Sequence, residues 1–240
     1  MRALFSLFFL MLLVVLTGCP SDQALMGTQT DFSGIDKFGR PAERVEVSIE
    51  RQILTAYEAG NPVLQMKVVV GSKQRPTPIM QDRISGVKFA PEWNPPETIL
   101  NEDIYPRLNK NPKFLKRGWV VYKGGTVIDP DTIDWKSVDP RNYRFVQKSG
   151  GKNALGTLRF NHHNPYAIFI HDTPNKQLFN REDRFASSGC IRAHNATKLA
   201  EWMFKISDKN LTAREINDMR KGPTKIVNFG RSIPLYVDPV

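Results

Sequence analysis

The stretch "ILTAYEAGNPVLQMKVVVG", residues 53–71, carries the clearest sign of the fold. Two runs of aliphatic and β-branched residues flank Gly60 and Asn61, residue types that favour a tight turn. The stretch therefore predicts a β-hairpin. Just before it, "VEVSIE" alternates apolar and polar residues with the two-residue period of a half-buried strand.

The same signal recurs along the rest of the chain. Further strand-like runs are "GWVVYKGG", "YRFVQK", "GTLRFN", "YAIFIH", "KIVNF" and "SIPLYV". Helical signals are fewer: "NATKLAEWMFKI" places its apolar residues on one side, and "TAREINDMRK" begins with Thr212 and Glu215 spaced as a capping box. We therefore expect a mainly β fold with short helices.

Chain length and the position of a Pro- and Asn-rich segment predict the domain organisation. A chain of 240 residues suits one large domain, and 40% hydrophobic residues are enough to fill a core. Residues 95–117 are rich in Pro and Asn and contain a short helical pattern around Tyr105. This predicts a partly helical insert, from about Trp93 to Tyr143, within a β domain of residues 41–240.

The first residues, "MRALFSLFFLMLLVVLTGC", predict export. Arg2 is followed by an apolar run shorter than the ~20 residues that a membrane-spanning helix needs, as in a secretory signal peptide. The end of the run resembles the bacterial lipobox, in which the signal is cleaved before a cysteine that is then lipidated. We expect a signal peptide over 1–18, lipidation of Cys19 and a flexible tether over 19–40. An uncleaved anchor, or an ordinary signal peptide with a chance cysteine, is the alternative.

Charge limits the classes of binding partner, and the cysteine count limits disulfide pairing. The chain has 34 Lys and Arg against 24 Asp and Glu, a formal charge of +10, which favours anionic partners. The basic residues are scattered and no RNA-binding signature interleaves them with aromatics, so we do not expect nucleic acid binding. If Cys19 carries lipid, Cys190 is left as a thiol without a disulfide partner.

The surroundings of Cys190 predict a nucleophile. In "HDTPNKQLFNREDRFASSGCIRAHN", residues 171–195, His171 ends an apolar run and Cys190 follows small residues. A thiolate is a nucleophile, and a nearby imidazole can take the proton of the thiol and later return it to a leaving amine. Gly189 lets substrate approach the backbone, whose amides are candidate oxyanion donors. The alternative is a buried core cysteine near a strand-end histidine, but its Ser, Gly and Arg neighbours are unlike a core.

These residues resemble the L,D-transpeptidase catalytic domain of the YkuD family. That family carries a histidine, a spacer of about fifteen residues, then Ser/Thr-His-Gly-Cys. This chain has Ser188 where histidine is usual and Arg192 where asparagine is common, variants that resemble the larger Gram-negative branch. The segments "VVVGSKQRPTPIMQDRISGVKFAPEWNPP" and "GGKNALG" extend the resemblance, which covers about Val45 to Val240.

The resemblance implies an L,D-transpeptidase-like β-sandwich with a capping insert over the active site. It implies peptidoglycan crosslinking: Cys190 attacks a donor tetrapeptide stem, and a diaminopimelate amine accepts the acyl group. His171 is then base and acid, oriented by a backbone carbonyl near Asp172, and backbone groups of Ser188 and Gly189 face the oxyanion. Arg192 pairs with a stem carboxylate or forms a surface salt bridge. No cofactor is implied, and carbapenems are expected to acylate the thiol.

Other histidine, aspartate and aromatic residues have simpler expected roles. His162 and His163 are adjacent, so in a strand they point to opposite faces, and no metal site is expected. The Asp172 carboxylate is expected to form a turn with Thr173 and Pro174. Four aromatics either line the cleft or pack the insert: Trp93, Trp119, Trp135 and Tyr143.

Two other functions are alternatives to transpeptidation. An L,D-carboxypeptidase, or a hydrolase that detaches wall-linked protein, would use the same Cys190 and His171 with water as acceptor. A non-catalytic wall-binding lipoprotein would tolerate loss of the thiol.

Pro20 follows Cys19 where an aspartate would favour inner-membrane retention. The expected location is therefore periplasmic, anchored by lipid to the inner face of the outer membrane.

Overall fold

The computed structural model describes residues 34–36, 39–116 and 118–240. The predicted signal peptide, the lipidation candidate Cys19 and most of the predicted tether lie outside these residues. None of the helices in the described part is both long enough and apolar enough to cross a membrane.

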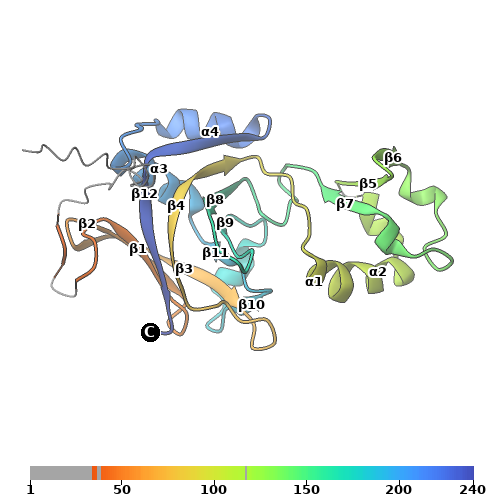
Figure 1. Cartoon of the computed structure of the whole chain (residues 1–240), viewed down its shortest axis with the longest axis horizontal. Coiled ribbons are helices and arrows are strands. Elements are labelled where there is room, and N and C mark those ends of the chain that lie inside the picture. Colours follow the sequence, from red (N-terminus) through yellow and green to blue (C-terminus); the bar gives the residue numbers. More distant parts are fainter. Residues whose placement is uncertain (1–33, 37–38, 117) are drawn as a thin grey trace, which may run out of the picture. The chain divides into compact units, whose positions relative to one another are not determined.

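Nine strands form the main sheet (Figure 1). They are β1 (Arg44–Ser48), β2 (Ile53–Glu58), β3 (Asn61–Gly71), β4 (Met80–Phe89), β8 (Leu158–His162), β9 (Ile170–His171), β10 (Phe185–Ser187), β11 (Ile191–Ala193) and β12 (Lys225–Asp238). The predicted hairpin is present as β2 and β3, joined at Ala59 and Gly60, which both have positive φ. The prediction of a mainly β fold with short helices is confirmed.

The main sheet curls back on itself. Its strand order is β10-β3-β11-β9-β8-β4-β12-β1-β2, and β2 pairs with β3 as well as with β1. Eight strands thus close a ring, with β10 attached at the end of β3. Because successive side chains of a strand alternate between faces, the closed sheet turns one set of side chains inward on every strand.

The inward side chains make one apolar core. Every strand from β1 to β4 contributes to it, as do β8, β9, β11 and β12. Helix α3 (Ala196–Ile206) adds Leu199, Trp202 and Met203, the stripe predicted from its sequence. Helix α4 (Ala213–Lys221) begins with the predicted capping box between Thr212 and Glu215.

Between β4 and β8 the chain builds a separate small sheet with its own core. Its strands are β5 (Trp119–Lys123), β6 (Thr126–Ile128) and β7 (Arg144–Gln147), in the order β6-β5-β7. Short helical turns accompany them: α1 (Glu97–Ile99), η1 (Leu100–Ile104), α2 (Tyr105–Lys110), η2 (Pro112–Lys116), η3 (Pro130–Thr132) and η4 (Pro140–Asn142). A last turn, η5 (Lys176–Asn180), lies in the main domain. The buried side chains of the small sheet and its turns form a second apolar cluster, distinct from the main core.

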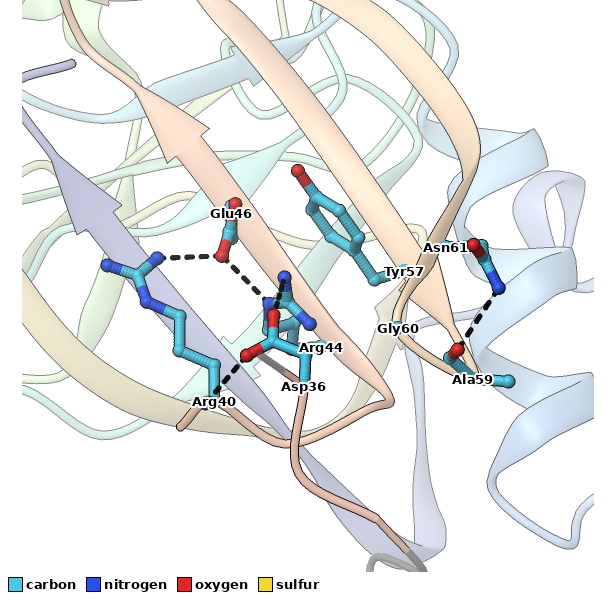
Figure 2. A pocket seen from close by; sticks show the side chains of 8 residues that line it. All are labelled: Asp36, Arg40, Arg44, Glu46, Tyr57, Ala59, Gly60 and Asn61. Atoms are coloured by element: carbon cyan, nitrogen blue, oxygen red, sulfur yellow. Dashed lines mark hydrogen bonds and ion pairs between the residues drawn. The ribbon is translucent and has the colours of Figure 1, made fainter. Parts of the chain in front are cut away.

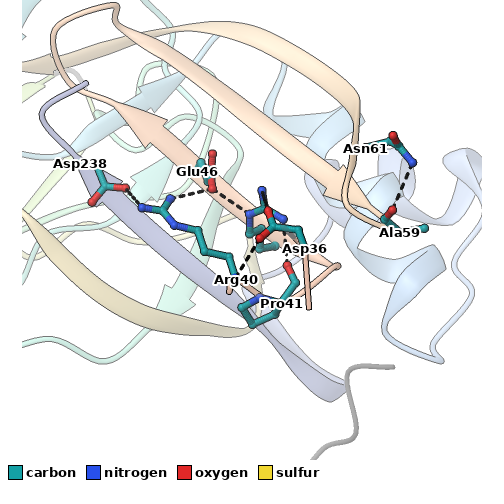
Figure 3. A network of polar contacts seen from close by, with 8 residues as sticks. Asp36, Arg40, Pro41, Glu46, Ala59, Asn61 and Asp238 are labelled. Atoms are coloured by element: carbon teal, nitrogen blue, oxygen red, sulfur yellow. Dashed lines mark hydrogen bonds and ion pairs between the residues drawn. The ribbon is translucent and has the colours of Figure 1, made fainter. Parts of the chain in front are cut away.

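Residues 34–36 and 39–42, here called the N-terminal turn, are held to the main sheet by ion pairs (Figure 2). Arg44 on β1 is 3% exposed, pairs with Asp36 at 2.8 Å and lies over the Tyr57 ring at 3.9 Å. Arg40 pairs with Glu46 at 2.7 Å and with Asp238 at 3.0 Å (Figure 3). The N-terminal turn is therefore joined to both β1 and the end of β12.

Candidate active site

A cavity of about 310 Å³ is lined by five segments of the chain. These segments are residues 75–76, 93–103, 154–155, 166–171 and 187–192. The predicted Cys190, His171, Ser188 and Arg192 all reach this one cavity. A larger hollow of about 720 Å³ lies at the N-terminal turn, but charged side chains that pair with one another line it.

Residues 187–190, here called the nucleophile turn, hold Cys190 between β10 and β11. The Ser187 hydroxyl donates to the carbonyl of Cys190 at 2.6 Å and accepts from the Gly189 amide at 3.2 Å. Gly189 has φ +105°, and an added Cβ would lie 2.6 Å from Ile168 Cδ1. Only glycine fits both constraints. Cys190, a free thiol, is thus fixed at the cavity by a turn that other residues cannot form.

His171 is the last residue of β9 and is 3% exposed. Its Nδ1 donates to the carbonyl of Asp172. Because a carbonyl can only accept, the proton of the neutral ring belongs on Nδ1, which leaves the Nε2 lone pair as the basic atom. Burial, with a smaller effect of the Arg192 charge, lowers the pKa of His171 to about 4. The imidazole is therefore neutral and able to accept a proton at pH 7.

The Asp172 side chain turns away from His171. Its carboxylate accepts from Thr157 N at 3.0 Å, from Thr157 Oγ1 at 2.8 Å and from Lys176 Nζ at 2.6 Å. Burial favours a higher pKa for Asp172, but the Lys176 ammonium and the Thr157 donors outweigh it and lower that pKa. The expected turn with Thr173 and Pro174 is wrong for this carboxylate: it is a buried anchor, since ammonium and amide donors stabilise its charge there. What meets His171 is the Asp172 carbonyl, as the resemblance implied.

Two arginines flank His171 across the sheet. Arg159 on β8 and Arg192 on β11 are its direct partners in the strand register, so all three side chains lie on the same face. Burial lowers the pKa of both guanidinium groups, and the Nε of each is buried without a hydrogen-bond partner. Arg192 also lines the cavity. It is therefore a half-buried cation at the cavity, whereas Arg159 bonds Asn161 and lies over the Phe169 ring.

The thiol of Cys190 rests neutral in this environment. Burial raises its pKa, and a hydrogen bond with the Phe169 backbone and the charges of Arg192 and Arg159 offset that effect only in part. Thiol and imidazole are thus both uncharged before substrate binds. An uncharged pair of this kind is suited to general-base catalysis, in which an imidazole takes the thiol proton as sulfur attacks.

The segment that follows β4 forms one wall of the cavity. Trp93, Pro96, Thr98, Ile99 and Asp103 come from it. Asp103 accepts two hydrogen bonds, at 2.8 and 3.1 Å, from Arg75, which also lines the cavity.

The four aromatic residues considered for the cleft divide between the cavity and the small sheet. Trp93 lines the cavity and its ring contacts Trp119 at 5.8 Å between centroids. Trp135 and Tyr143 are buried in the core of the small sheet, 5.1 Å apart. The cavity therefore receives one of the four and the insert packs the rest.

The two adjacent histidines have different environments. His162 is buried and its Nδ1 lies 2.9 Å from Asp82, whereas His163 is exposed. Among residues 34–36, 39–116 and 118–240, His, Cys, Asp and Glu side chains form no group of three or more that could hold a metal. His162 instead supports the loop at the cavity, because Asn164 contacts it and also binds the carbonyl of Ile168.

Comparison with known proteins identifies the family. The model of the YkuD family, described as the L,D-transpeptidase catalytic domain, matches residues 42–225. A Haemophilus influenzae protein, "Putative L,D-transpeptidase", is 37% identical over 161 residues, which are 66% of this chain and 33% of that protein. The chain thus spans about a third of the length of this curated relative.

Solved L,D-transpeptidases overlap the chain loosely. One from Mycobacterium smegmatis has 14% identity and a TM-score of 0.37, covering 82% of this chain and 58% of its own. L,D-transpeptidase 3 from Mycobacterium tuberculosis, solved with a faropenem-derived adduct, has 13% identity and a TM-score of 0.37, covering 83% and 61%. The assignment rests on the family match, which spans more than half of the chain. This chain belongs to the YkuD family of L,D-transpeptidase catalytic domains.

Proposed function

We propose that this protein crosslinks peptidoglycan through an acyl-enzyme on Cys190. The observation that carries the proposal is the meeting of Cys190, His171 and the glycine-containing nucleophile turn at one cavity of about 310 Å³. Family membership supports the choice of substrate class.

The first half of the reaction forms the acyl-enzyme. Cys190 sulfur attacks the carbonyl carbon after the third residue of a donor tetrapeptide stem, and its proton passes to His171 Nε2. The carbonyl electron pair moves to oxygen and returns when the C–N bond breaks. His171 gives its proton to the departing D-alanine amine, which leaves a thioester on Cys190.

The second half transfers the acyl group. A diaminopimelate side-chain amine attacks the thioester, His171 accepts a proton from it, and the thiolate leaves and is reprotonated. The half-buried guanidinium of Arg192 at the cavity supports recognition of a stem carboxylate. Carbapenems follow as covalent inhibitors, since their strained lactam acylates an activated thiol.

The deciding experiment incubates the protein with disaccharide tetrapeptides and identifies the products by mass spectrometry. Crosslinked dimers are the expected result. Tripeptides without dimers would favour the L,D-carboxypeptidase alternative, in which water accepts the acyl group. Unchanged substrate at every enzyme concentration would contradict both, and would leave the wall-binding lipoprotein.

We further propose that the protein is a periplasmic lipoprotein held by lipid on Cys19. The lipobox-like end of the apolar N-terminal run supports this, and Pro20 supports the inner face of the outer membrane over the inner membrane. The predicted tether over 19–40 is too long, because residues 34–36 and 39–40 are bound to the main sheet. At most about fifteen residues, 19–33, would separate the lipid from the domain.

A further inference from the structure

Thr77 lies in the loop of residues 72–79 between β3 and β4, and it is 5% exposed. Its hydroxyl donates to the carbonyl of Gly189 at 2.7 Å and accepts from the amide of Gly71 at 2.8 Å. One hydroxyl thus joins the end of β3 to the nucleophile turn. Both bonds are buried, where losing one partner leaves a costly unpaired backbone group.

The bond to Gly189 fixes more than a carbonyl. In a trans peptide the carbonyl and the N–H of the same unit point in opposite directions, and no described peptide bond is cis. The N–H opposite the Gly189 carbonyl belongs to Cys190. Because Thr77 holds the carbonyl, it also sets the direction of the Cys190 amide.

The loop of Thr77 has little freedom to move. An added Cβ on Gly71 would lie 2.3 Å from the Arg75 carbonyl and 2.4 Å from Thr77 N, so the loop packs directly on the backbone at the end of β3. Ser187 holds the two neighbouring peptide units, through the amide of Gly189 before this peptide and the carbonyl of Cys190 after it. The orientation of the Cys190 amide is therefore set before any substrate arrives.

We propose that Thr77 is a positioning residue, which presets the Cys190 amide as a hydrogen-bond donor to the oxyanion of acyl transfer. This rests on the proposed function, since it requires an acyl group at Cys190. During attack the sulfur–carbon bond forms, the carbonyl electron pair moves to oxygen, and the thiol proton passes to His171. The Cys190 amide then donates to that oxygen without having to reorient.

The test compares two reactions of the same thiol. Imipenem acylates Cys190 through a tetrahedral oxyanion, whereas iodoacetamide alkylates it by displacement at carbon, with no oxyanion. In Thr77→Val, which has nearly the same shape but no hydroxyl, we expect acylation to slow by about tenfold to a hundredfold. Alkylation should stay within about twofold of the unsubstituted protein, since it depends on sulfur and His171 alone.

Two further variants complete the test. Thr77→Ser keeps the hydroxyl and should restore acylation to near the original rate. Thr126→Val makes the same substitution on the exposed strand β6 and should change neither reaction. Rates come from intact-protein mass spectrometry, and near-ultraviolet circular dichroism checks the fold.

Each outcome separates the two proposals. Equal slowing of acylation and alkylation in Thr77→Val would reduce Thr77 to a purely structural role and overturn the inference. A folded Thr77→Ser that acylates tenfold or more slowly than the unsubstituted protein would overturn it too, and this criterion holds even where the valine variant does not fold. If the unsubstituted protein resists imipenem and leaves stem peptides unchanged, the proposed function itself fails.

Discussion

At the scale of single residues, the resting state of the site is set by burial. Cys190 has a raised pKa and His171 a lowered one, and both shifts favour the uncharged form. An uncharged pair avoids placing two ions in a poorly hydrated cavity, and it keeps the thiol unreactive until substrate is present. The pH dependence of acylation therefore reports on His171.

We expect acylation by imipenem to stay nearly constant as pH falls from 7 to about 5, and then to decline through the His171 pKa of about 4. Below that pKa the ring is protonated and cannot accept the thiol proton. Intact-protein mass spectrometry over short reaction times gives the rates. A decline centred near the ordinary value of about 6.5 would show that burial does not depress this histidine. Reactivity persisting well below pH 4 would indicate a resting ion pair.

Removal of the nucleophile gives the second expectation at this scale. Cys190→Ala should abolish turnover and keep the fold, because the residue lies at the cavity rather than in the centre of the core. Cys190→Ser should lose about three orders of magnitude or more, since a hydroxyl is far harder to ionise. Product formation from disaccharide tetrapeptides measures both. Substantial activity in the alanine variant would assign the nucleophile to another residue.

At the scale of elements, the position of His171 depends on a contact between strands and a helix. Arg220 on α4 donates to Thr157 Oγ1 at 2.8 Å, and that hydroxyl donates in turn to Asp172. Gly156 packs so closely on Asp172 that a Cβ would lie 2.6 Å from its Cγ. The carbonyl that orients His171 is therefore held by α4, the loop before β8 and the residue after β9 together.

Asp172→Ala removes the acceptor for Thr157 and Lys176 and frees the carbonyl that holds His171. We expect kcat to fall by about tenfold to a hundredfold with KM little changed, because the base is displaced while the cavity wall remains. Asp172→Asn keeps an oxygen that accepts from Thr157 and should recover part of the rate. Asp131→Ala, which removes the exposed ion pair with Lys116, is the control. A lower melting temperature without any change in kcat would limit Asp172 to stability.

How far the sequence predicts the elements depends on how regular their apolar period is. The apolar residues of the hairpin and of α3 repeat regularly, and the capping box of α4 is a short local motif. The structure has all three where expected. Strand β4 escaped prediction because its register shifts between Ile84 and Gly86, so the buried positions change phase within one strand. The two predicted C-terminal strands are one strand, β12, with a register shift between Asn228 and Ile233.

The candidate site shows the same limit. Cys190, His171 and Arg192 are recognisable because they lie close in sequence to a known motif. The run "YAIFIH" pairs only at Ile170 and His171, because the Asn164 side chain binds the amides of Tyr166 and Ile168 and turns the chain. Thr77 lies in a segment that extends the resemblance, but its contact with the nucleophile turn could not be predicted, and neither could the position of Arg159 beside His171. Their place beside the site depends on strand register and on a loop contact over 112 positions, which no local pattern encodes.

At the scale of the whole molecule, ion pairs join the beginning and the end of the described chain. Arg40 and Arg44 share Glu46, and Arg40 also reaches Asp238 on β12 (Figure 3). Burial favours a higher pKa for Glu46, but its hydrogen bonds with Arg44 and Arg40 outweigh that effect and lower it. A carboxylate with a lowered pKa adds stability above its unfolded value, and this stability is lost as pH falls through the folded value.

Glu46→Gln should therefore lower the free energy of unfolding by about 1 to 2 kcal/mol at pH 7. The difference from the unsubstituted protein should shrink as pH falls below about 4.5, the ordinary pKa of a glutamate, because Glu46 then becomes protonated as well. Urea unfolding between pH 3 and 7 measures it. Glu50→Gln, on an exposed residue, is the control. A difference that stays constant over this pH range would mean that charge is not the source.

The lipid anchor also belongs to the whole molecule. Cys19→Ala should release the protein from membranes as a soluble form, or leave it unprocessed with its signal peptide attached. Fractionation of cell extracts and the mass of the mature protein distinguish these outcomes. Membrane association and a mass unchanged from the unsubstituted protein would contradict lipidation at Cys19.

The position of β12 between β4 and β1 has a consequence for biosynthesis. Residues 225–238 leave the ribosome after every other strand, yet they form the link through which the ring closes. Until they emerge, β1 and β4 present open edges of the kind that pair with other chains. The ring can therefore close only after residues 225–238 have emerged, and until then a nascent chain exposes edges that favour aggregation.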